Sequence, residues 1–510
     1  MDIQIDDKFR QALHFLEETD ENLFITGHAG TGKSTLLSYV LLRSSKQIVV
    51  LAPTGVAALN IRGQTIHSFF RFRPQVTLEQ ARRQASQLKD KEIYLHIDLI
   101  IIDEISMVRA DLLDCIDLFL QTVLKKSEPF GGIRIAFFGD LYQLAPVISS
   151  QEREYFKTRY ESSYFFSAKV MKEGRFSFQF LELEKIYRQQ DLLFIDLLNA
   201  IRKKSLSEQD LKRLNERSVP LQGDDAGYLY LTATNRAAEE INAQKLEEIP
   251  SKLFSFTAQI EGDFDLKNAP TEFNLQLKVG AQVMFLVNDL SGLWVNGTIG
   301  RVVSASDSEI SVDIEGSIVS VGRHTWDLYK YIFDEKKNRL EQEKEGFFEQ
   351  FPLKLAWAIT IHKSQGKTYD RVIIDFGRAL FAPGQAYVAL SRCRTLEGII
   401  LKRPFEERHV ILDFQVVKFL TTLQYKIAEM KCSLENKQTL IRQAIDRGEK
   451  LEIIYLKTND EKTERTIVPT YMGEMEYGKK RYVGVEAFCT KRNEKRVFKV
   501  ERILEILPRR

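Results

Sequence analysis

Short apolar runs alternate with amphipathic stretches along most of the chain. The runs NLFIT (22–26), LIII (99–102) and IRIAFF (133–138) hold few polar residues, and such runs predict strands buried on both faces. After the first run, apolar residues within 36–41 recur at the spacing of a helix. Buried strands that alternate with helices predict α/β domains built on parallel sheets.

The pattern changes between Asn242 and Leu353, where short β-like runs are separated by glycine turns. The runs are LKVGAQVMFLVN, NGTIGRVV, SEISVDI and SIVSVGR. They predict a small β-barrel inserted into a second α/β domain. The charged stretch DEKKNRLEQEKEG that follows is predicted to be a solvated arm or hairpin.

The C-terminal part of the chain predicts a linker followed by a separate domain. Apolar residues recur at helical spacing within residues 406–436, which predicts a helical linker. A helix closed by Gly448 then leads into segments with strand-like patterns, namely LEIIYLK, RTIVPTYM, RYVGVEAFC and KRVFKVERILEI. These segments predict a small β-barrel within residues 437–510.

Composition limits the class of protein. The chain has 510 residues, and a prior of about 150 residues per domain suggests three or four domains. No apolar run follows a basic start, and no apolar stretch is long enough to span a membrane, so we expect a cytoplasmic protein without a signal peptide. Four widely spaced cysteines exclude a dense disulfide framework and most zinc sites.

The net charge of +2 is small, but its distribution is uneven. Residues 437–510 contain 18 Lys and Arg against 12 Asp and Glu, whereas the first 436 residues contain 55 against 59. The surplus of 6 in the tail makes it a candidate for contact with polyanions. A solvated basic surface explains the same surplus equally well.

The stretch GHAGTGKS at residues 27–34 fits the pattern of a phosphate-binding loop between a strand and a helix. Its glycines, Gly27, Gly30 and Gly32, allow backbone N–H groups to close around phosphates. Lys33 is expected to reach the β- and γ-phosphates, and Ser34 is expected to hold Mg²⁺. The loop therefore predicts ATP as cofactor, together with magnesium.

Two acidic residues follow the buried strand LIII directly. Asp103 and Glu104 stand at its carboxyl end, where ligands bind in open α/β sheets. Asp103 is the expected second metal ligand, and Glu104 is the expected base for the attacking water. A third strand ends in GDLYQLAPV, whose Gln143 is a candidate for contact with the γ-phosphate or its water.

The ordered set of motifs resembles the superfamily-one DNA helicases of the petite-integration-frequency (PIF) type, close to the RecD-like branch. The motifs are LAPTGVAALNI, GQTIHSFF, IIIDEISMV, GDLYQLAPV, LEKIYRQ, TATNRAAEEIN, LAWAITIHKSQGKTYD and AYVALSRCRT. The segment LLDCIDLFLQTVLKKSEPFGGI is similar to the signature helix of the PIF branch. The resemblance implies two RecA-like motor domains with ATP in the cleft between them, and with a small β-barrel inserted in the second.

The resemblance also assigns nucleotide contacts that the residue chemistry does not select. Arg188 and Arg392 match the two arginine fingers contributed by the second motor domain, and Tyr187 matches an aromatic residue that stacks on adenine. Gly366 matches a glycine near the nucleotide. The family reads adenine with a glutamine that falls on Arg10 here, so the neighbouring Gln11 is the candidate, and adenine selectivity is in doubt.

A track for a nucleic-acid strand is suggested by HSFFRFRP (67–74), in which aromatic and basic residues interleave. Aromatic faces stack bases and arginines follow phosphates, although the same phenylalanines could cap the edge of a core. Phe69 of this stretch is a candidate for stacking on a base. The resemblance implies that the other strand contacts are Thr54, Thr65, His67, Thr234, Asn235, His362 and Lys363. It also implies 5′→3′ movement, which the residue chemistry itself does not give.

The tail resembles the bacterial WYL domain, a small β-barrel found on regulators. The matching features are the leading helix, Tyr455, Arg465 with Pro469, Tyr482, Arg496-Val-Phe498, and Arg502-Ile503, whereas Arg481-Tyr482-Val483 replaces the naming triplet. By this resemblance Arg465, Arg496 and Arg502 are candidate nucleic-acid contacts, which suit phosphate. The alternative is a docking module whose arginines pair with the tail's own acids.

Together these features predict an ATP-dependent 5′→3′ DNA helicase that moves on single-stranded DNA and is regulated by its C-terminal domain. The predicted domains are 1–180 (with a wedge near 54–75), 181–242 with 353–405, the insertion 243–352, the linker 406–436 and the tail 437–510. The expected partners are single-stranded and forked DNA and other replication or repair proteins at a bacterial nucleoid. An ATP-switched clamp that does not unwind, and an RNA translocase, remain alternatives.

Overall fold

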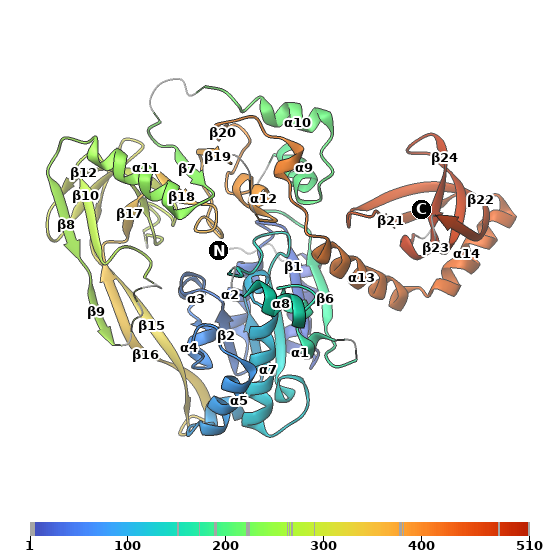
Figure 1. The fold of residues 1–510 in the computed structure, drawn as a ribbon, viewed down its shortest axis with the longest axis horizontal. Helices are drawn as coiled ribbons and strands as arrows, with labels where there is room; N and C mark the ends of the chain where they lie inside the picture. The colour runs from blue at the N-terminus through green and yellow to red at the C-terminus, as the bar shows by residue number, and fades with distance from the viewer. Residues whose placement is uncertain are drawn as a thin grey trace. The chain divides into compact units, whose positions relative to one another are not determined.

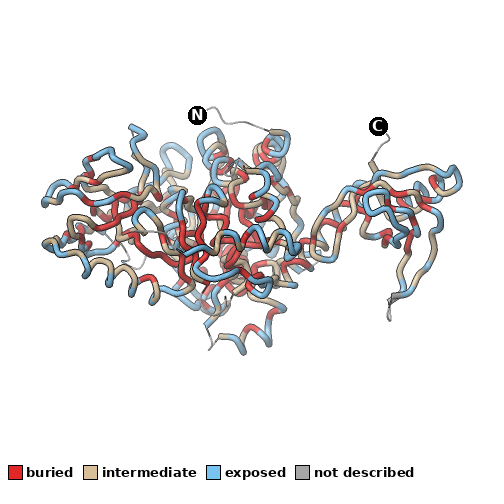
Figure 2. The backbone as a smooth tube through the Cα atoms, turned by 90° about the horizontal axis from the view of Figure 1, so that it is seen from above, coloured by how far each residue is buried: buried red, intermediate tan, exposed pale blue. Residues whose placement is uncertain are grey.

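The computed structural model describes residues 6–149, 152–172, 174–187, 191–220, 225–262, 264, 266, 269–289, 291–376, 380, 382–477 and 480–507. The chain divides into two compact units, Met1–Arg202 with Leu206–Ile411, and Lys203–Ser205 with Leu412–Arg510. Figure 1 shows both, the second from α13 onward in red. In each unit the buried residues gather in the interior and the exposed residues follow the outer turns (Figure 2).

The first unit contains a parallel sheet of six described strands, which defines its N-terminal lobe. Their order is β3 (Gln64–Thr65), β2 (Ile48–Ala52), β4 (Leu99–Ile102), β5 (Arg134–Phe138), β1 (Leu23–Gly27) and β6 (Gln179–Leu183). The helices of this lobe are α1 (Asp7–Glu18), α2 (Lys33–Arg43), α3 (Gly55–Asn60), α4 (Ile66–Phe69), α5 (Leu78–Gln87), α6 (Glu92–Leu95), α7 (Ala110–Leu124) and α8 (Arg153–Arg159). Leu36, Leu37 and Val40 of α2 pack on the buried strands, as their helical spacing predicts.

A second parallel sheet forms the other lobe of the same unit. Its described strands are β18 (Ala358–Thr360), β7 (Leu229–Thr232), β19 (Val372–Asp375) and β20 (Ile399–Leu401), in that order. Its helices are α9 (Leu192–Arg202), α10 (Glu208–Asn215), α11 (Asn235–Glu247) and α12 (Gln385–Leu390). Both sheets are therefore of the parallel α/β type that the alternation of strands and helices predicts.

Antiparallel strands are inserted between β7 and β18. One sheet has the order β14 (Ser317–Val321), β13 (Ile310–Ile314), β12 (Ile299–Ala305), β11 (Gln282–Phe285) and β17 (Leu353–Leu355). A second pairs β10 (Asn274–Lys278) with β8 (Leu253–Thr257), and a third has the order β15 (His324–Asp334), β16 (Arg339–Gln350) and β9 (Gln259–Gly262). Buried Val283, Val302, Val312 and Phe351 form part of a shared core.

The charged stretch predicted to be an arm or hairpin is the turn and second strand of the β15–β16 hairpin. Its turn is exposed, as predicted, while the neighbouring part of β15 contacts the N-terminal lobe. The hydroxyl of Tyr331 accepts a hydrogen bond from the Val50 backbone N–H at 3.0 Å. The ring of Phe333 stacks on His96 with centroids 3.7 Å apart.

The second unit is a pair of helices with one antiparallel sheet. The helices are α13 (Phe414–Lys431) and α14 (Leu434–Arg447), and the sheet order is β24 (Glu494–Lys499), β23 (Lys480–Cys489), β22 (Lys462–Tyr477), β21 (Leu451–Leu456) and β25 (Ile503–Ile506). Helix α14 ends at Gly448, which has φ 65°, a conformation that favours glycine. Ile441 of α14 packs against Ile453, Val485 and Phe498 of the sheet.

None of the helices in the described part of the chain combines the length and apolar character needed to cross a membrane.

Gly131 gives a test of packing in the N-terminal lobe. It has φ 64°, and a Cβ there would lie 2.9 Å from the Leu120 carbonyl oxygen and 2.7 Å from Leu124 Cδ1, both on α7. We expect Gly131→Ala to lower the free energy of unfolding by about 1–3 kcal/mol, because it combines left-handed strain with a clash against a helix backbone. Thermal unfolding of the full chain measures this.

The matched control is Gly132→Ala. Gly132 also has a positive φ, 82°, but an added Cβ would meet nothing nearer than Lys126 at 3.9 Å. It should therefore show only the strain of the left-handed backbone. Equal losses in the two variants would mean that the clash with α7 does not contribute.

Candidate functional site

The phosphate-binding loop lies between β1 and α2, as predicted from its sequence context. Gly30 and Gly32 have φ 82° and 84°, values that other residues rarely adopt. A Cβ on Gly27 would lie 2.6 Å from the backbone oxygen of Leu183. The loop therefore requires glycine at these positions, and the first turn of α2 directs its free N–H groups toward the loop.

Lys33 begins α2 and turns back over the loop. Its Nζ donates to the backbone oxygens of Gly27 at 2.8 Å and His28 at 3.0 Å. Burial lowers the pKa of this lysine, while Asp140 and Glu104 act in the opposite direction. An ammonium that is poorly solvated and held by neutral carbonyls is well placed to exchange them for phosphate oxygens.

Ser34 and Asp103 are the residues that would hold magnesium. Ser34 is exposed on the first turn of α2, and Asp103 follows β4. One oxygen of Asp103 accepts from the Glu104 backbone N–H at 2.9 Å, and burial raises the pKa of this carboxyl. A hydroxyl and a poorly solvated carboxylate are hard oxygen ligands of the kind that Mg²⁺ combines with phosphate oxygens and water, so the residues fit this cation.

Glu104 has a left-handed backbone conformation and a raised side-chain pKa. Its φ of 50° lies in the left-handed region, a strain that is found mainly at functional sites. Burial first, and the charge of Asp103 second, raise its pKa to about 7. A carboxylate with a pKa near neutrality is suited to accept a proton as a general base.

Gln365 connects the base to Gln143. Its Nε2 donates to Glu104 Oε2 at 3.0 Å and to Gln143 Oε1 at 3.3 Å. It belongs to the segment HKSQGKT of the C-terminal lobe, whereas its two partners belong to the N-terminal lobe. The sequence analysis missed Gln365, although it lies between two residues that it selected in this motif, Lys363 and Gly366.

Of the two expected arginine fingers, the structure describes Arg392. Arg392 is 1% exposed, and its guanidinium donates to the backbone oxygens of Val388 at 2.9 Å and Lys367 at 3.1 Å. Its positive charge acts on Glu104 and lowers the pKa of that carboxyl. The second expected finger, Arg188, lies outside the described residues.

Tyr187 lies against the phosphate-binding loop. A Cβ on Gly32 would be 3.7 Å from its ring, and its backbone N–H donates to the Gly30 oxygen at 2.9 Å. Gln11 is exposed on α1, and Gly366 has φ 78° with open space beside it. Tyr187 is thus beside the loop, whereas Gln11 occupies an exposed position on α1.

A buried ion pair joins the two lobes beside the loop, and no sequence motif predicts it. Arg202 of α9 donates to Asp140 Oδ1 at 3.1 Å and contacts His28 Nε2 at 2.8 Å, and it lies over the ring of Tyr142 at 4.2 Å. Burial alone would raise the pKa of Asp140, but Arg202 and Lys33 hold it below its usual range. The hydroxyl of Tyr387 also accepts from the Ala29 backbone N–H at 3.0 Å.

Four of the expected strand-binding residues line one cavity of about 520 Å³ between the lobes. They are Thr54, Asn235, His362 and Lys363. Glu104 and Gln365 line the same cavity, so the candidate base and the candidate strand site share one space. Two lysines that the sequence analysis did not select, Lys354 and Lys367, also line it. Burial lowers the pKa of Lys367 to about 8 and that of Lys354 well below its usual range.

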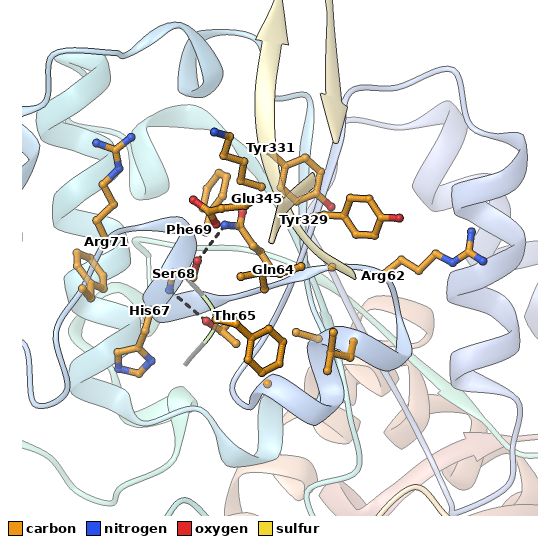
Figure 3. A pocket seen from close by; sticks show the side chains of 18 of the residues that line it. Arg62, Gln64, Thr65, His67, Ser68, Phe69, Arg71, Tyr329, Tyr331 and Glu345 are labelled. Carbon is orange, nitrogen blue, oxygen red and sulfur yellow. Dashed lines mark hydrogen bonds between the residues drawn. The ribbon is translucent and has the colours of Figure 1, made fainter. Parts of the chain in front are cut away.

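The other strand candidates of the N-terminal lobe, Thr65, His67 and Phe69, line a separate cavity of about 620 Å³. Tyr329 and Tyr331 of the β15–β16 hairpin line the same cavity, and Figure 3 shows Phe69 beside Tyr331 while His67 points away from the two tyrosines. Burial lowers the pKa of His67, so it is neutral near pH 7. Residues of both lobes therefore line this cavity.

Phe70 and Phe72 of HSFFRFRP are core residues, whereas Phe69 also lines the cavity of about 620 Å³. Phe70 and Phe72 are 0% and 5% exposed, and their rings pack on Phe119 of α7 with centroids 5.3 and 5.6 Å apart. Phe69 is 6% exposed and packs against Tyr94 and Tyr331. Of the two alternatives, base stacking and the edge of a core, the structure shows the core for Phe70 and Phe72, because α7 offers them an apolar face.

Three of the expected strand-binding threonines are helix N-caps. The Oγ1 atoms of Thr54, Thr65 and Thr234 accept from the backbone N–H groups of Ala57, Ser68 and Ala237 at 3.3, 3.1 and 3.3 Å. Thr234 begins α11 immediately before Asn235. Helix capping alone accounts for a threonine at each of these positions. It also holds each side chain at the end of a parallel strand or in the loop that follows it.

The three tail arginines differ in exposure. Arg465 is 8% exposed and donates to Thr463 Oγ1 at 3.3 Å. Burial raises the pKa of the Tyr425 and Tyr455 hydroxyls, and hydrogen bonds with Arg502 oppose this rise. Arg496 lies on the surface and pairs with Glu494 at 2.6 Å. Only Arg496 of these three combines exposure with a surface position on the sheet.

Comparison with known proteins identifies both units. A family model described as PIF1-like helicase matches residues 7–212, and one described as WYL domain matches residues 437–508. The ATP-dependent DNA helicase Pif1 of Bdellovibrio bacteriovorus is 35% identical over 434 residues, which cover 82% of this chain and 92% of the relative. The human ATP-dependent DNA helicase PIF1 is also 35% identical, but the match covers only 62% of its length.

Solved structures agree with this similarity. Bacteroides Pif1 in complex with ADP-AlF4 has a TM-score of 0.76 at 38% identity, covering 83% of this chain and 98% of that one. Bacteroides Pif1 bound to ssDNA has a TM-score of 0.59 at 38% identity, covering 82% and 97%. The chain thus belongs to the Pif1 family of ATP-dependent DNA helicases and carries a WYL domain at its C-terminus.

Proposed function

We propose that this protein hydrolyses ATP to move 5′→3′ along single-stranded DNA and unwinds the duplex ahead of it. The observation that carries the proposal is the cavity of about 520 Å³ that Glu104 shares with Thr54, Asn235, His362 and Lys363. A base and a strand-binding surface in one space allow hydrolysis and strand movement to affect each other. Membership of the Pif1 family, and the single-stranded DNA bound to the Bacteroides relative, support DNA as the track.

Nucleotide binding is proposed to use both lobes. Lys33 and the loop glycines hold the phosphates, Ser34 and Asp103 hold Mg²⁺, and Tyr187 covers the base of the nucleotide. When bound, the magnesium ion neutralises phosphate charge and orients the phosphate chain. Glu104 takes the proton of the attacking water, and Gln143 holds that water; Arg188 and Arg392 complete the charge around the γ-phosphate. Gln11 and Gly366 remain candidates for contact with the nucleotide.

Strand binding is proposed to be independent of sequence. Threonine and asparagine side chains at helix N-termini, and a lysine in a turn, suit the phosphate and sugar backbone, which carries no sequence information. Lys354 and Lys367 add positive charge to the same cavity, and a nearby phosphate would favour their protonated forms. Thr65, His67, Phe69 and Thr234 are proposed to extend this contact.

The unwinding proposal is tested with two duplexes that differ only in the polarity of a single-stranded tail. We expect ATP-dependent strand separation from the duplex with a 5′ tail and little from the duplex with a 3′ tail, measured by release of a fluorescent strand. Separation from the 3′-tailed duplex alone would contradict the proposed direction.

The matched control for this assay is Glu104→Gln. The amide has the shape of the carboxyl group but cannot accept the proton of water, so turnover should fall by about 10²–10⁴-fold while ATP still binds. Lys33→Ala removes a phosphate contact and should lose turnover as well. Normal turnover in Glu104→Gln would exclude this residue as the base.

We further propose that the WYL domain binds nucleic acid and so regulates the motor. Its surplus of 6 positive charges supports this, and Arg496 is exposed on the sheet, whereas Arg465 and Arg502 are engaged within the unit. The proposal therefore depends chiefly on Arg496 among the three predicted contacts. Pairing with Glu494 is the competing role for this side chain.

Charge reversal at Arg496 tests the tail. Arg496→Glu should weaken binding of an oligonucleotide by the full chain and reduce the slope of log affinity against log salt by about one, since one phosphate contact is lost. Arg442→Glu, which changes the same charge at an exposed position of α14, is the control. Wild-type affinity in Arg496→Glu, or equal losses in both variants, would contradict a specific contact at Arg496.

A further inference from the structure

The Gln365 side chain is the direct link between the strand-binding segment of one lobe and the catalytic groups of the other. Its Nε2 lies 3.0 Å from Glu104 Oε2 and 3.3 Å from Gln143 Oε1. Its Oε1 is buried and has no hydrogen-bond partner among the described residues. The amide thus offers one donor group to both catalytic side chains and keeps one buried acceptor without a partner among the described residues.

The backbone around Gln365 is a tight turn that also carries two strand-binding candidates. The N–H of Ser364 donates to the Thr360 oxygen at 3.0 Å, that of Gln365 to His362 at 3.2 Å, and that of Lys367 to Ser364 at 3.1 Å. Ser364 is fully buried, and its hydroxyl donates to the Ile361 oxygen at 2.7 Å. A turn closed by this many short-range bonds moves as one body.

The same turn is also tied to Arg392. The Nη1 of Arg392 donates to the backbone oxygens of Ser364 at 3.4 Å and Lys367 at 3.1 Å. A displacement of the turn would therefore move Gln365, and also the carbonyls that hold Arg392. The first change would reach Glu104 directly, because Glu104 accepts a hydrogen bond from Gln365 at 3.0 Å.

We infer that Gln365 is the positioning residue through which strand occupancy of the cavity controls the catalytic base Glu104. A strand bound at His362 and Lys363 fixes the turn, and the turn fixes where Nε2 meets Glu104 and Gln143. The inference deepens the proposed function and rests on it, because it concerns how DNA accelerates ATP hydrolysis at the same site.

The chemistry of the contact supports a role in positioning. An amide N–H that donates to a carboxylate favours its ionised form and fixes its direction, and both effects help a general base. Hydrogen bonds weaken steeply with distance and angle, so a small shift of the turn is enough to make or break this one. The Gln365 side chain does not itself exchange protons with water, and Glu104 remains the group that takes the proton.

The test is Gln365→Ala in the full chain, with ATP turnover measured without DNA and with saturating oligodeoxythymidine. Loss of a charge-assisted hydrogen bond to the base should reduce the ratio of the two rates by about tenfold or more. The KM for ATP and the affinity for the oligonucleotide should stay close to wild type, because Gln365 is proposed to hold neither ligand. An unchanged ratio of rates would overturn the inference.

Gln244→Ala is the matched control. Gln244 lies on the exposed face of α11, and its Nε2 donates to Glu248 Oε1 at 2.9 Å, so it has the same kind of bond away from the cavity. It should keep the wild-type ratio. A similar loss in Gln244→Ala would show a general effect of such substitutions and would also overturn the inference.

Gln365→Glu separates positioning from folding. It keeps the size of the side chain but removes the N–H donor that meets Glu104 and Gln143, so DNA-stimulated turnover should fall as in Gln365→Ala while the KM for ATP stays close to wild type. Wild-type stimulation in Gln365→Glu would contradict the inference. Absence of stimulation in the unsubstituted chain would instead overturn the proposed function.

Discussion

The buried ion pair between Arg202 and Asp140 joins the two lobes of the motor behind the phosphate-binding loop. Both side chains are almost fully removed from solvent, and Arg202 also contacts His28 of the loop itself. Removing one partner of such a pair leaves an unpaired buried charge, which typically costs about 3–5 kcal/mol. The contact therefore fixes α9 of one lobe against the segment that carries Gln143 in the other. This contact therefore resists relative movement of the lobes at this point.

The turn that carries Gln365 is a place where such movement has a chemical effect. It meets Glu104 and Gln143 through single hydrogen bonds of 3.0 and 3.3 Å rather than through an ion pair. It also borders the cavity proposed to hold the DNA strand. A cleft that closes around a nucleotide and reopens needs a contact that holds its lobes together and another that can break and re-form. The Arg202–Asp140 pair is a contact of the first kind, and the Gln365 hydrogen bonds are of the second. The β15–β16 hairpin, at Val50 and His96, and Tyr387, at Ala29, add further contacts between the lobes.

Much of this arrangement could be predicted from local sequence. Gly27, Lys33, Asp103 and Glu104 lie at the ends of apolar runs, and the carboxyl ends of parallel strands bring such residues together. Phe70 and Phe72 could not be placed in this way, because the apolar face of α7 that buries them is remote in sequence. Arg202 had no local signal, since a basic residue at the end of an amphipathic helix is usually solvated. Gln365 had a signal, its place within HKSQGKT, but its partner Glu104 lies 261 positions earlier.

The central claim is that strand binding and ATP hydrolysis are coupled in one space between the lobes. Steady-state ATP turnover of the full chain, measured with and without single-stranded DNA, tests this claim most directly. The shared cavity predicts that DNA accelerates turnover and that the acceleration saturates with DNA concentration. Turnover that is the same with and without DNA would contradict the claim, and acceleration by RNA alone would reassign the track.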